Sequence, residues 1–359
     1  MMQFGDLYRN RRVLVTGHTG FKGSWLTLWL HKLGANVTGI ALDPDTQPNH
    51  WDMLNLNIDD NRIDIRDTES IQNKIKSFRP EIIFHLAAQP LVRRSYQEPL
   101  ENWSVNVMGT ANILEACRQV DSVKAIVAVT SDKVYANQEK SKAYKENDRL
   151  GGHDPYSASK AACEILIDSY RKSFFDGPGA PLLASARAGN VIGGGDWSVD
   201  RLIPDIVRSL SQEEKLIIRS PHSTRPWQHV LDCLAGYLQL GTKLLEGNRK
   251  FADAWNFGPG LNDNCTVSDV LNRLKRYWPD ISWIQTTEKH PHEATLLHLN
   301  HEKASSLLDW QPAWDLEKAL ETTAEWYRSV LEKDITPSLD QLSSFIEDAH
   351  SARISWVTS

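Results

Sequence analysis

Cysteine and long apolar runs are scarce in this sequence, and their scarcity narrows the class of protein. Only four cysteines occur among 359 residues, and they are far apart. This spacing indicates buried thiols in a reducing compartment, with neither a disulfide framework nor a zinc site. No segment reaches the roughly 18 apolar residues that a membrane-spanning helix needs, and Met1 to Arg12 contains no apolar signal sequence. We therefore expect a cytoplasmic protein that has no membrane partner.

Positive charge is not in excess either. The sequence has 40 Lys and Arg residues against 46 Asp and Glu residues, which gives a formal net charge of −6. This balance argues against a nucleic-acid partner, although a local basic pocket can still hold a phosphate. A group of histidines lacks cysteine or carboxylate partners at ligand spacing, so no metal site is predicted. These histidines are His290, His292, His298 and His301.

The most informative pattern present is a tyrosine and a lysine four residues apart, Tyr156 and Lys160. Among nine tyrosines, only Tyr156 is followed by lysine at this distance. On a helix the spacing places both side chains on one face, where the ammonium group is expected to lower the tyrosine pKa from about 10. A phenol activated in this way can take the proton of a sugar or alcohol hydroxyl while its carbon gives up a hydride. A helix-surface contact is the competing explanation, and the start of the chain argues against it.

A glycine-rich turn lies between a predicted strand at residues 12–16 and a predicted helix at residues 24–33. Its spacing is G-x-x-G-x-x-G. Glycines allow the backbone to approach a pyrophosphate, and the helix N-terminus stabilises the negative charge. A purely structural turn is the alternative, which the flanking strand and helix disfavour. The cofactor contacts predicted in this turn are Gly17, Thr19, Gly20, Phe21, Lys22 and Gly23.

Further cofactor contacts are predicted at the ends of the next strands. Asp43 follows the second strand, where a carboxylate accepts hydrogen bonds from the adenosine ribose. Because this carboxylate repels a 2′-phosphate, the sequence favours NAD over NADP. Asp64 and Ile65 are predicted to contact the adenine, with a loop-capping role for Asp64 as the alternative. Leu86 and Ala87 end the fourth strand and are predicted to lie against the cofactor.

Strands and helices alternate through the first half of the chain. This order predicts an α/β fold with a Rossmann-type doubly wound parallel sheet and a smaller C-terminal α/β substrate lobe. We expect an NAD-binding domain at residues 1–189, with elements near 226–258 returning to it, and a substrate-binding lobe over most of 190–359. The polar tail after Pro337 is expected to be loosely held. Predicted strands are 12–16, 36–42, 62–65, 82–86, 125–130 and 182–186, and predicted helices include 24–33, 68–78 and 98–118.

Thr16, the glycine turn and the Tyr156/Lys160 pair together resemble the short-chain dehydrogenase/reductase superfamily. The length, Ala87 with its neighbouring alanine, and the downstream lobe are similar to its extended branch, which modifies nucleotide sugars. In that branch a Ser or Thr after the fifth strand polarises the reacting hydroxyl, and Ser131 occupies this position here. The resemblance also implies a homo-oligomer, a dimer or tetramer, because helices corresponding to residues 98–118 and 155–174 pair protomers in the superfamily.

The segment from Ser131 to Tyr135 resembles nucleotide-sugar 4,6-dehydratases, which typically read Thr-Asp-Glu-Val-Tyr. In those enzymes the Asp protonates the departing C6 hydroxyl and the Glu removes the C5 proton. This sequence keeps Asp132 but has Lys133 in place of the Glu. Lys133 is therefore either the C5 base or a fixed cation that stabilises the C5 enolate. In the second case Tyr135 or a water removes the proton.

Three further stretches, 190–197, 225–232 and 308–312, are similar to the dehydratases that act on CDP-glucose, and the resemblance covers nearly the whole chain. The cytidine nucleotide follows from this resemblance alone. The implied reaction is C4 oxidation by NAD, loss of water across C5 and C6 and hydride return to C6, which belongs to deoxysugar or O-antigen synthesis. The alternatives are a nucleotide-sugar C4 epimerase, a dehydratase of another NDP-hexose, and a catalytically silent NAD-binding regulator.

The two phosphates of such a substrate require cations in the second lobe. Asn190 and Arg225 match substrate-binding positions of the extended branch, and an arginine can hold phosphate through two parallel hydrogen bonds. For Arg187 and Arg201, substrate binding and an ordinary ion pair are equally good explanations. The predicted substrate contacts are Gln89, Asn190, Arg201, Arg225 and His292.

Overall fold

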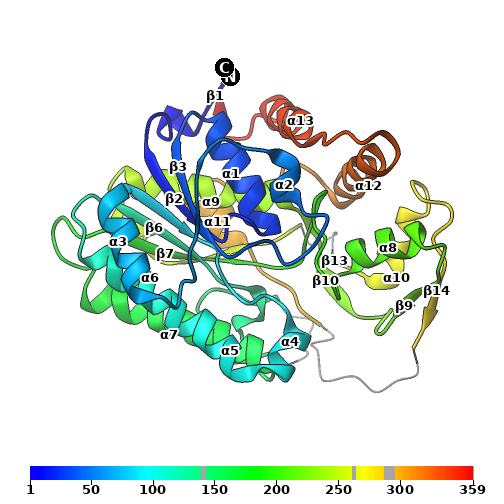
Figure 1. The fold of residues 1–359 in the computed structure, drawn as a ribbon, viewed down its shortest axis with the longest axis horizontal. Helices are drawn as coiled ribbons and strands as arrows, with labels where there is room; N and C mark the ends of the chain where they lie inside the picture. Colours follow the sequence, from blue (N-terminus) through cyan, green and yellow to red (C-terminus); the bar gives the residue numbers. More distant parts are fainter. Residues whose placement is uncertain (139–142, 261–263, 287–295, 359) are drawn as a thin grey trace.

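The computed structural model describes residues 1–138, 143–260, 264–286 and 296–358, and its centre is a seven-stranded parallel sheet (Figure 1). The order along the sheet reverses between β2 and β5, which is the arrangement of doubly wound dinucleotide-binding folds. In spatial order the strands are β12 (Ala254–Phe257), β7 (Leu182–Ala188), β6 (Ala125–Val129), β5 (Ile82–His85), β2 (Arg12–Thr16), β3 (Asn36–Ala41) and β4 (Asp59–Arg62).

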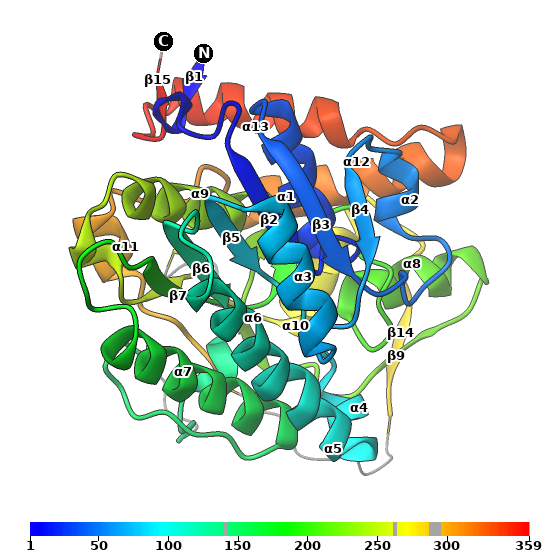
Figure 2. The same cartoon turned by 60° about the vertical axis from the view of Figure 1, so that its left-hand side comes forward.

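Both faces of this sheet are buried by helices. Along β2, Val13 and Val15 belong to one apolar core, and Leu14 belongs to the other. Successive strand residues point to opposite faces, so a continuous apolar run is what a sheet covered on both sides requires. One face carries α1 (Phe21–Lys32) and α9 (Val230–Leu245), and the other carries α3 (Thr68–Phe78), α6 (Gly109–Arg118) and α7 (Pro155–Ser173), as Figures 1 and 2 show.

Most predicted elements have the expected bounds, with two informative differences. The third strand, β4, precedes the predicted residues 62–65; it is a polar edge strand, where an apolar pattern is not needed. The predicted helix 98–118 is continuous but irregular, because a π-helical segment, Ser104–Met108, separates α5 (Pro99–Trp103) from α6. Two short helices, α2 (His50–Leu54) and α4 (Val92–Gln97), complete the first half.

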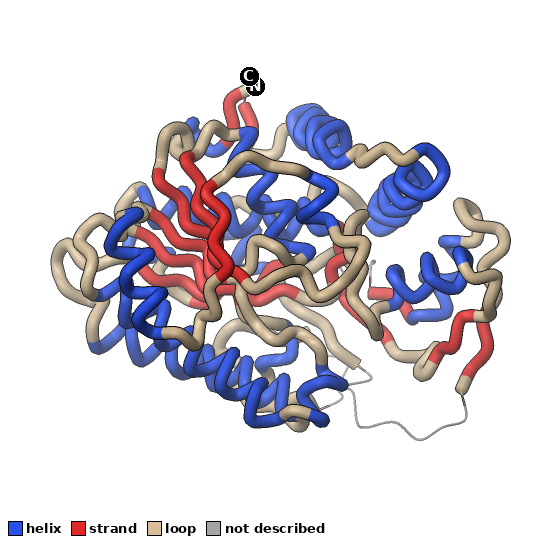
Figure 3. The backbone as a smooth tube through the Cα atoms, in the orientation of Figure 1, coloured by secondary structure: helices blue, strands red, loops and turns tan. Residues whose placement is uncertain are grey.

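The second half forms a smaller lobe of short paired strands beside the sheet (Figure 3). Helix α10 begins with a capping box: the Thr266 side chain accepts from the Asp269 N–H, and the Asp269 carboxylate accepts from the Thr266 N–H. From this half of the chain, α9 and β12 join the central sheet layer. The lobe elements are β8 (Val191–Ile192) with β11 (Gln228–His229), β9 (Leu216–Ile218) with β14 (Trp283–Gln285), β10 (Thr224–Pro226) with β13 (Asn264–Thr266), α8 (Leu202–Ser211) and α10 (Val267–Leu274).

The expectation of a loosely held tail after Pro337 is wrong. Helix α13 (Ser338–Ser351) packs against α1, and Phe345 within it is fully buried. The strand β15 (Val357–Thr358) then pairs antiparallel with β1 (Met2–Gln3), so the two termini lie side by side (Figure 2). The helices that precede this tail are α11 (Glu302–Leu307) and α12 (Leu316–Lys333). None of the helices in the described ranges is both long and apolar enough to cross a bilayer.

Candidate active site

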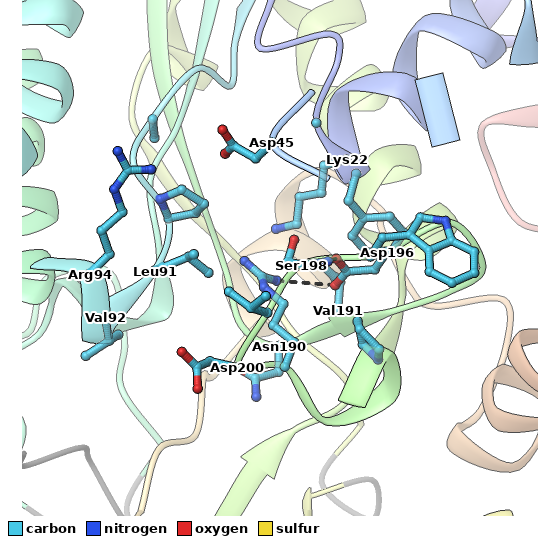
Figure 4. Close-up of a pocket in the computed structure, with 18 of the residues that line it drawn as sticks. Lys22, Asp45, Leu91, Val92, Arg94, Asn190, Val191, Asp196, Ser198 and Asp200 are labelled. Atoms are coloured by element: carbon cyan, nitrogen blue, oxygen red, sulfur yellow. Dashed lines mark hydrogen bonds and ion pairs between the residues drawn. The ribbon is translucent and has the colours of Figure 1, made fainter. Parts of the chain in front are cut away.

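A cleft of about 1150 Å³ lies at the carboxyl ends of the parallel strands. In open α/β sheets this edge, at the point where the strand order reverses, is where ligands bind. One wall is formed by the glycine turn, the ends of the first five sheet strands and α4, and the other wall comes from the second lobe. In Figure 4 the side chains of Lys22, from α1, and Asn190, from the lobe, point into this space.

The glycine turn is packed so tightly that two of its members must be glycine. A Cβ on Gly17 would lie 2.7 Å from the backbone nitrogen of Ala87, and Gly17 has a φ of +76°. A Cβ on Gly23 would lie 2.0 Å from the carbonyl oxygen of Gly17. Gly20 is the N-cap of α1 and provides no side-chain cap, so the first amide groups of this helix are available to an anion in the cleft. Thr19, Phe21, Lys22 and Leu86 also line the cleft.

Two acidic residues lie where the adenosine half of a dinucleotide was predicted. Asp43 lines the cleft, and its side chain is 86% exposed. Its carboxylate forms an ion pair with the Arg62 guanidinium at 2.9 Å. Asp64 and Ile65 line the cleft beside it. The Asp64 carboxylate pairs with Arg66 at 2.5 Å, and this pairing holds the pKa of Asp64 below its ordinary value. The structure thus brings the predicted cofactor residues to one wall.

Helix α7 carries Tyr156 and Lys160 into the cleft. The helix starts with strong local signals, because the Asp154 side chain accepts a hydrogen bond from the Ser157 N–H and Pro155 is its first residue. The Lys160 ammonium donates to the Val129 carbonyl oxygen at 3.4 Å. The helix therefore presents both functional side chains to the cleft, and the sheet edge also holds Lys160.

The expected lowering of the Tyr156 pKa does not occur in the chain alone. Burial raises the pKa of Tyr156 to about 12, and hydrogen bonding with Ser131 opposes this rise. Burial also lowers the pKa of Lys160. Both ionised forms lose water in the cleft, and this loss outweighs the attraction that the four-residue spacing suggested.

Ser131, Asp132 and Lys133 follow the end of β6 and line the same cleft. The Ser131 hydroxyl donates to one Asp132 oxygen at 3.0 Å and accepts from the Lys133 N–H at 3.2 Å. The second Asp132 oxygen, Oδ2, is buried and has no hydrogen-bond partner among the described residues. Burial raises the pKa of Asp132, although the nearby Lys133 lowers it. This arrangement favours a protonated carboxyl group that can act as an acid.

Tyr135 cannot serve as the alternative base at C5. Its side chain is 1% exposed and does not line the cleft. Its hydroxyl donates to Asn256 Oδ1 at 2.7 Å and accepts from Arg187 at 2.9 Å. Arg187 is itself buried in an ion pair with Glu164, so it is a structural group and not a phosphate ligand.

Within the described part of the chain, no three His, Cys, Asp or Glu side chains are grouped as a metal site would require.

The predicted substrate residues are only partly brought together. Asn190, Arg201 and Arg225 line the lobe side of the cleft, and the Arg201 guanidinium lies 3.8 Å from the Asp196 carboxylate. Gln89 does not line the cleft; its side chain accepts from the Leu91 N–H at 2.5 Å and donates to the Leu91 carbonyl at 3.1 Å. His292 lies outside the described residues.

An ion-pair cluster in the cleft wall was not predicted from the sequence. Asp200 from the lobe pairs with Arg93 of α4 at 2.7 Å and with Arg219 at 3.2 Å. All three residues line the cleft, and the first pair joins its two walls. No local pattern could have revealed this contact, because Arg93 and Asp200 are 107 residues apart in sequence.

The glycine turn, the helix-borne Tyr156 and Lys160, and the buried Asp132 define a dinucleotide-dependent enzyme acting on a hydroxyl group. Residues 14–323 match the family described as GDP-mannose 4,6 dehydratase. A CDP-glucose 4,6-dehydratase of Salmonella typhimurium is 48% identical over 334 residues, which cover 90% of this chain and 92% of that protein. The chain therefore belongs to this family of nucleotide-sugar dehydratases, as the sequence resemblance implied.

Known structures share the fold of this chain. An epimerase from Methanothermobacter thermautotrophicus has a TM-score of 0.81 and 26% identity, covering 92% of this chain and 95% of that one. A dTDP-glucose 4,6-dehydratase from Bacillus anthracis in complex with NAD has a TM-score of 0.73 and 23% identity, covering 90% of this chain and 98% of that one. The predicted Rossmann-type fold class is confirmed.

Proposed function

We propose that this chain converts CDP-glucose to CDP-4-dehydro-6-deoxyglucose, with NAD as a cofactor that is oxidised again at the end of each turnover. The observation that carries the proposal is the convergence of the glycine turn, Tyr156 with Lys160, and Ser131 to Lys133 in one cleft. The choice of the cytidine nucleotide is supported by the 48% identity to a CDP-glucose 4,6-dehydratase.

The residues of the cleft fit NAD. The free amide groups at the start of α1 suit a pyrophosphate, and the exposed Asp43 carboxylate suits ribose hydroxyls. Lys160, beside the end of β6, suits the second ribose. When bound, NAD accepts a hydride from C4 of the sugar and returns it to C6.

Tyr156 removes the proton of the C4 hydroxyl in the first step. Its pKa of about 12 in the chain alone means that the phenol needs help to lose its own proton. Ser131 supplies part of this help, because hydrogen bonding between the two side chains lowers the Tyr156 pKa. Ser131 is also placed to orient the reacting hydroxyl, since both side chains line the same cleft.

Asp132 provides the acid for loss of water. The C4 ketone makes the C5 proton acidic, and the buried Asp132 carboxyl group gives its proton to O6 as water leaves. Lys133 has two possible roles, as the base at C5 or as a cation beside the C5 enolate. Replacing Lys133 with Met and measuring solvent deuterium at C5 separates them: exchange at the normal rate excludes Lys133 as the base.

The substrate assignment is tested with a panel of nucleotide sugars. The purified protein is incubated with CDP-, dTDP-, GDP- and UDP-glucose, and mass spectrometry follows the loss of one water. We expect this loss with CDP-glucose, and we expect the Tyr156→Phe variant to be slower by about 10²- to 10⁴-fold. Loss of water only from another nucleotide sugar would contradict the cytidine preference, and no loss from any of them would contradict the dehydratase function.

A nucleotide-sugar C4 epimerase is the nearest alternative. It would use the same glycine turn, Tyr156 and Lys160. It would have no use for a buried, protonated carboxyl group in the cleft, which is the state that burial favours for Asp132. An epimerised product that keeps its C6 hydroxyl would decide for this alternative.

We also propose that the chain forms a homo-oligomer through α5, the following π-helical segment and α7. Helices α5 and α7 pack against each other, and they expose large apolar side chains to solvent. Leu100 is 83% exposed, Met108 57% and Ile165 62%. Several large apolar side chains exposed on neighbouring elements are typical of protein interfaces. Light scattering of a double variant, Leu100→Glu with Ile165→Glu, should show monomers where the unmodified chain shows dimers or tetramers.

The four cysteines support the proposed cytoplasmic location. All four lie in the described residues and form no disulfide there, and Cys117, Cys163 and Cys233 are buried. Burial raises the pKa of each of these three thiols, so they are poorly reactive small hydrophobic groups. Fractionation of cells that express the chain tests the location directly.

A further inference from the structure

Helix α7 carries a third functional group on the face that bears Tyr156 and Lys160. Glu164 follows Lys160 by four residues, so it lies one turn further along the same face. Unlike the other two, Glu164 does not line the cleft, and its side chain is only 3% exposed. Its carboxylate accepts hydrogen bonds from Thr130 Oγ1 at 2.5 Å and from Ser185 Oγ at 2.8 Å. The catalytic helix is thereby fixed to the ends of β6 and β7.

Arg187 on β7 connects this carboxylate to the segment that carries the acid. One guanidinium nitrogen donates to Glu164 at 2.7 Å, and another donates to the Tyr135 hydroxyl at 2.9 Å. The guanidinium also lies 5.2 Å from the centre of the Tyr135 ring, over its face. Tyr135 is further held by stacking on Tyr144, with ring centres 5.0 Å apart. These contacts are all buried, where hydrogen bonds to charged groups are strongest.

We call the stretch that contains Ser131, Asp132 and Lys133 the catalytic segment. Its two ends are anchored to the same ion pair. Thr130 directly precedes Ser131 and bonds to Glu164. Tyr135 directly follows Val134 and bonds to Arg187. Between these anchors lie Ser131, Asp132 and Lys133, which line the cleft together with Thr130. Tyr135 and the two members of the ion pair do not line it.

The charge state of the ion pair keeps this arrangement stable. Burial alone would raise the pKa of Glu164, but the Arg187 guanidinium and the hydrogen bonds to Thr130 and Ser185 outweigh burial and lower it. The carboxylate is therefore ionised throughout the neutral range. Removing either charge would leave the other buried and unpaired, which destabilises the fold strongly.

We propose that the Glu164–Arg187 ion pair is a positioning device that sets Asp132 and Lys133 against Tyr156, and that Tyr135 and Thr130 are the positioning residues through which it acts. The proposal rests on the proposed function. It adds to that function two residues, Glu164 and Arg187, that do not line the cleft. Oxidation at C4 depends on Tyr156, whereas loss of water depends on the anchored segment. Loosening the anchors should therefore slow the second step more than the first.

The test removes single hydroxyl groups, because these changes keep the ion pair intact. Tyr135→Phe and Thr130→Val each remove one anchor with little change of shape. The matched control is Tyr8→Phe, which removes a buried hydroxyl that donates to the Leu238 carbonyl at 2.6 Å, away from the cleft. Each variant is assayed as the full chain with NAD and CDP-glucose. Absorbance of the reduced nicotinamide, product formation and thermal unfolding are recorded.

We expect reduced nicotinamide to accumulate in Tyr135→Phe and in Thr130→Val, because the sugar oxidised at C4 loses water more slowly in these variants. Their kcat should fall by about 10- to 100-fold, as expected for a small misplacement of reacting groups, while KM and NAD affinity change less than about twofold. Tyr8→Phe should lose stability to a similar degree without accumulating reduced nicotinamide. Wild-type turnover, together with the inactivity of Tyr156→Phe in the same assay, establishes the reaction independently.

Three results would overturn the positioning role. The first is unchanged kcat in both anchor variants. The second is a fall of kcat without reduced nicotinamide, which would place the defect at C4 oxidation. The third is the same kinetic pattern in Tyr8→Phe, which would mean that any loss of a buried hydroxyl has this effect. Failure of the wild type to dehydrate any nucleotide sugar would instead contradict the proposed function.

Discussion

The two walls of the cleft are built in different ways. The cofactor wall ends a sheet whose strands have four to seven residues. The substrate wall rests on pairs of strands with two or three residues each. In the first wall, backbone contacts such as that between Gly17 and Ala87 leave no room for change. In the second, partly exposed ion pairs such as Arg219 with Asp200 hold the parts together.

This difference indicates that the first wall positions the cofactor and the second adjusts to the substrate. A rigid wall presents the cofactor in a fixed position, as chemistry on a hydroxyl group requires. Exposed ion pairs contribute roughly 0–1 kcal/mol each, so the substrate wall can adjust when a charged nucleotide enters. Changes in the first wall should therefore abolish function, whereas changes in the second should shift affinities.

The largest effect is expected from Gly23→Ala. A methyl group there would lie 2.0 Å from the Gly17 carbonyl oxygen, so the turn or α1 must move. Such overpacking costs about 1–3 kcal/mol of stability, and NAD binding should fall below detection. Calorimetry and thermal unfolding measure both quantities. Gly177→Ala is the control, because an added Cβ there meets nothing within 4 Å; normal NAD binding by Gly23→Ala would show that the wall is less rigid than described.

The next largest effect concerns Asp132, at the junction of the walls. Asp132→Asn removes the acid, so kcat should fall by about 10²- to 10⁴-fold. The same change should stabilise the fold at neutral pH. Burial raises the Asp132 pKa in the folded chain, so its contribution to stability falls as pH rises from the ordinary value through the raised value.

Thermal unfolding as a function of pH checks this second effect. The melting temperature of Asp132→Asn should exceed that of the wild type above this pH window, and the two should converge below it. Asp121→Asn, at an exposed position, serves as the control and should show no such gain. A wild type that is the more stable protein at neutral pH would contradict the burial of an unpaired oxygen.

A smaller effect is expected from Arg225→Lys on the substrate wall. Arg225 is 7% exposed and lines the cleft. Lysine keeps the charge but loses the two-pronged geometry that suits a phosphate. Because a hydrogen bond to a charged group is worth about 1.5–3 kcal/mol, the KM for the nucleotide sugar should rise by about 10- to 100-fold with unchanged NAD affinity. A parallel loss of NAD affinity would mean that the walls are not independent.

The smallest effect is expected from Asp200→Asn. This change removes the carboxylate that pairs with Arg93 and Arg219 and leaves both arginines available to the phosphates of the substrate. Since exposed pairs are worth at most about 1 kcal/mol, KM should fall by no more than about fivefold and the melting temperature should hardly change. Steady-state kinetics at low and high salt would detect this fall in KM. A rise in KM would show that Asp200 is needed to build the wall.

Much of the cofactor wall could be predicted from the sequence because its signals are local. The glycine spacing, Asp43 after a strand and the pair Tyr156 and Lys160 each lie within one element and its flanks. The predicted fold class and family followed from the same patterns and are confirmed. The roles assigned to individual site residues are still predictions.

Other features depend on contacts between distant segments and left no local trace. The contact of Arg93 with Asp200 is of this kind, and so is the burial that raises the Tyr156 pKa. Gln89 was misplaced because a side chain after a strand can turn back onto its own loop, as its two bonds to Leu91 show. The signal for α13 was present: Leu342, Phe345, Ile346 and Ala349 repeat at helical spacing and are all buried.

The pairing of β1 with β15 bears on how the chain is made. Met2 and Gln3 lie opposite Thr358 and Val357, so β1 can find its partner only after β15 has been translated. Phe4 stacks on Trp356 with ring centres 5.0 Å apart. This contact also forms only after the C-terminal partner has been translated. The parallel sheet can assemble during synthesis, since domains fold from the amino-terminal side. The pairing of β1 with β15 therefore forms after the sheet, and a shortened chain without β15 would leave β1 and Phe4 without these contacts.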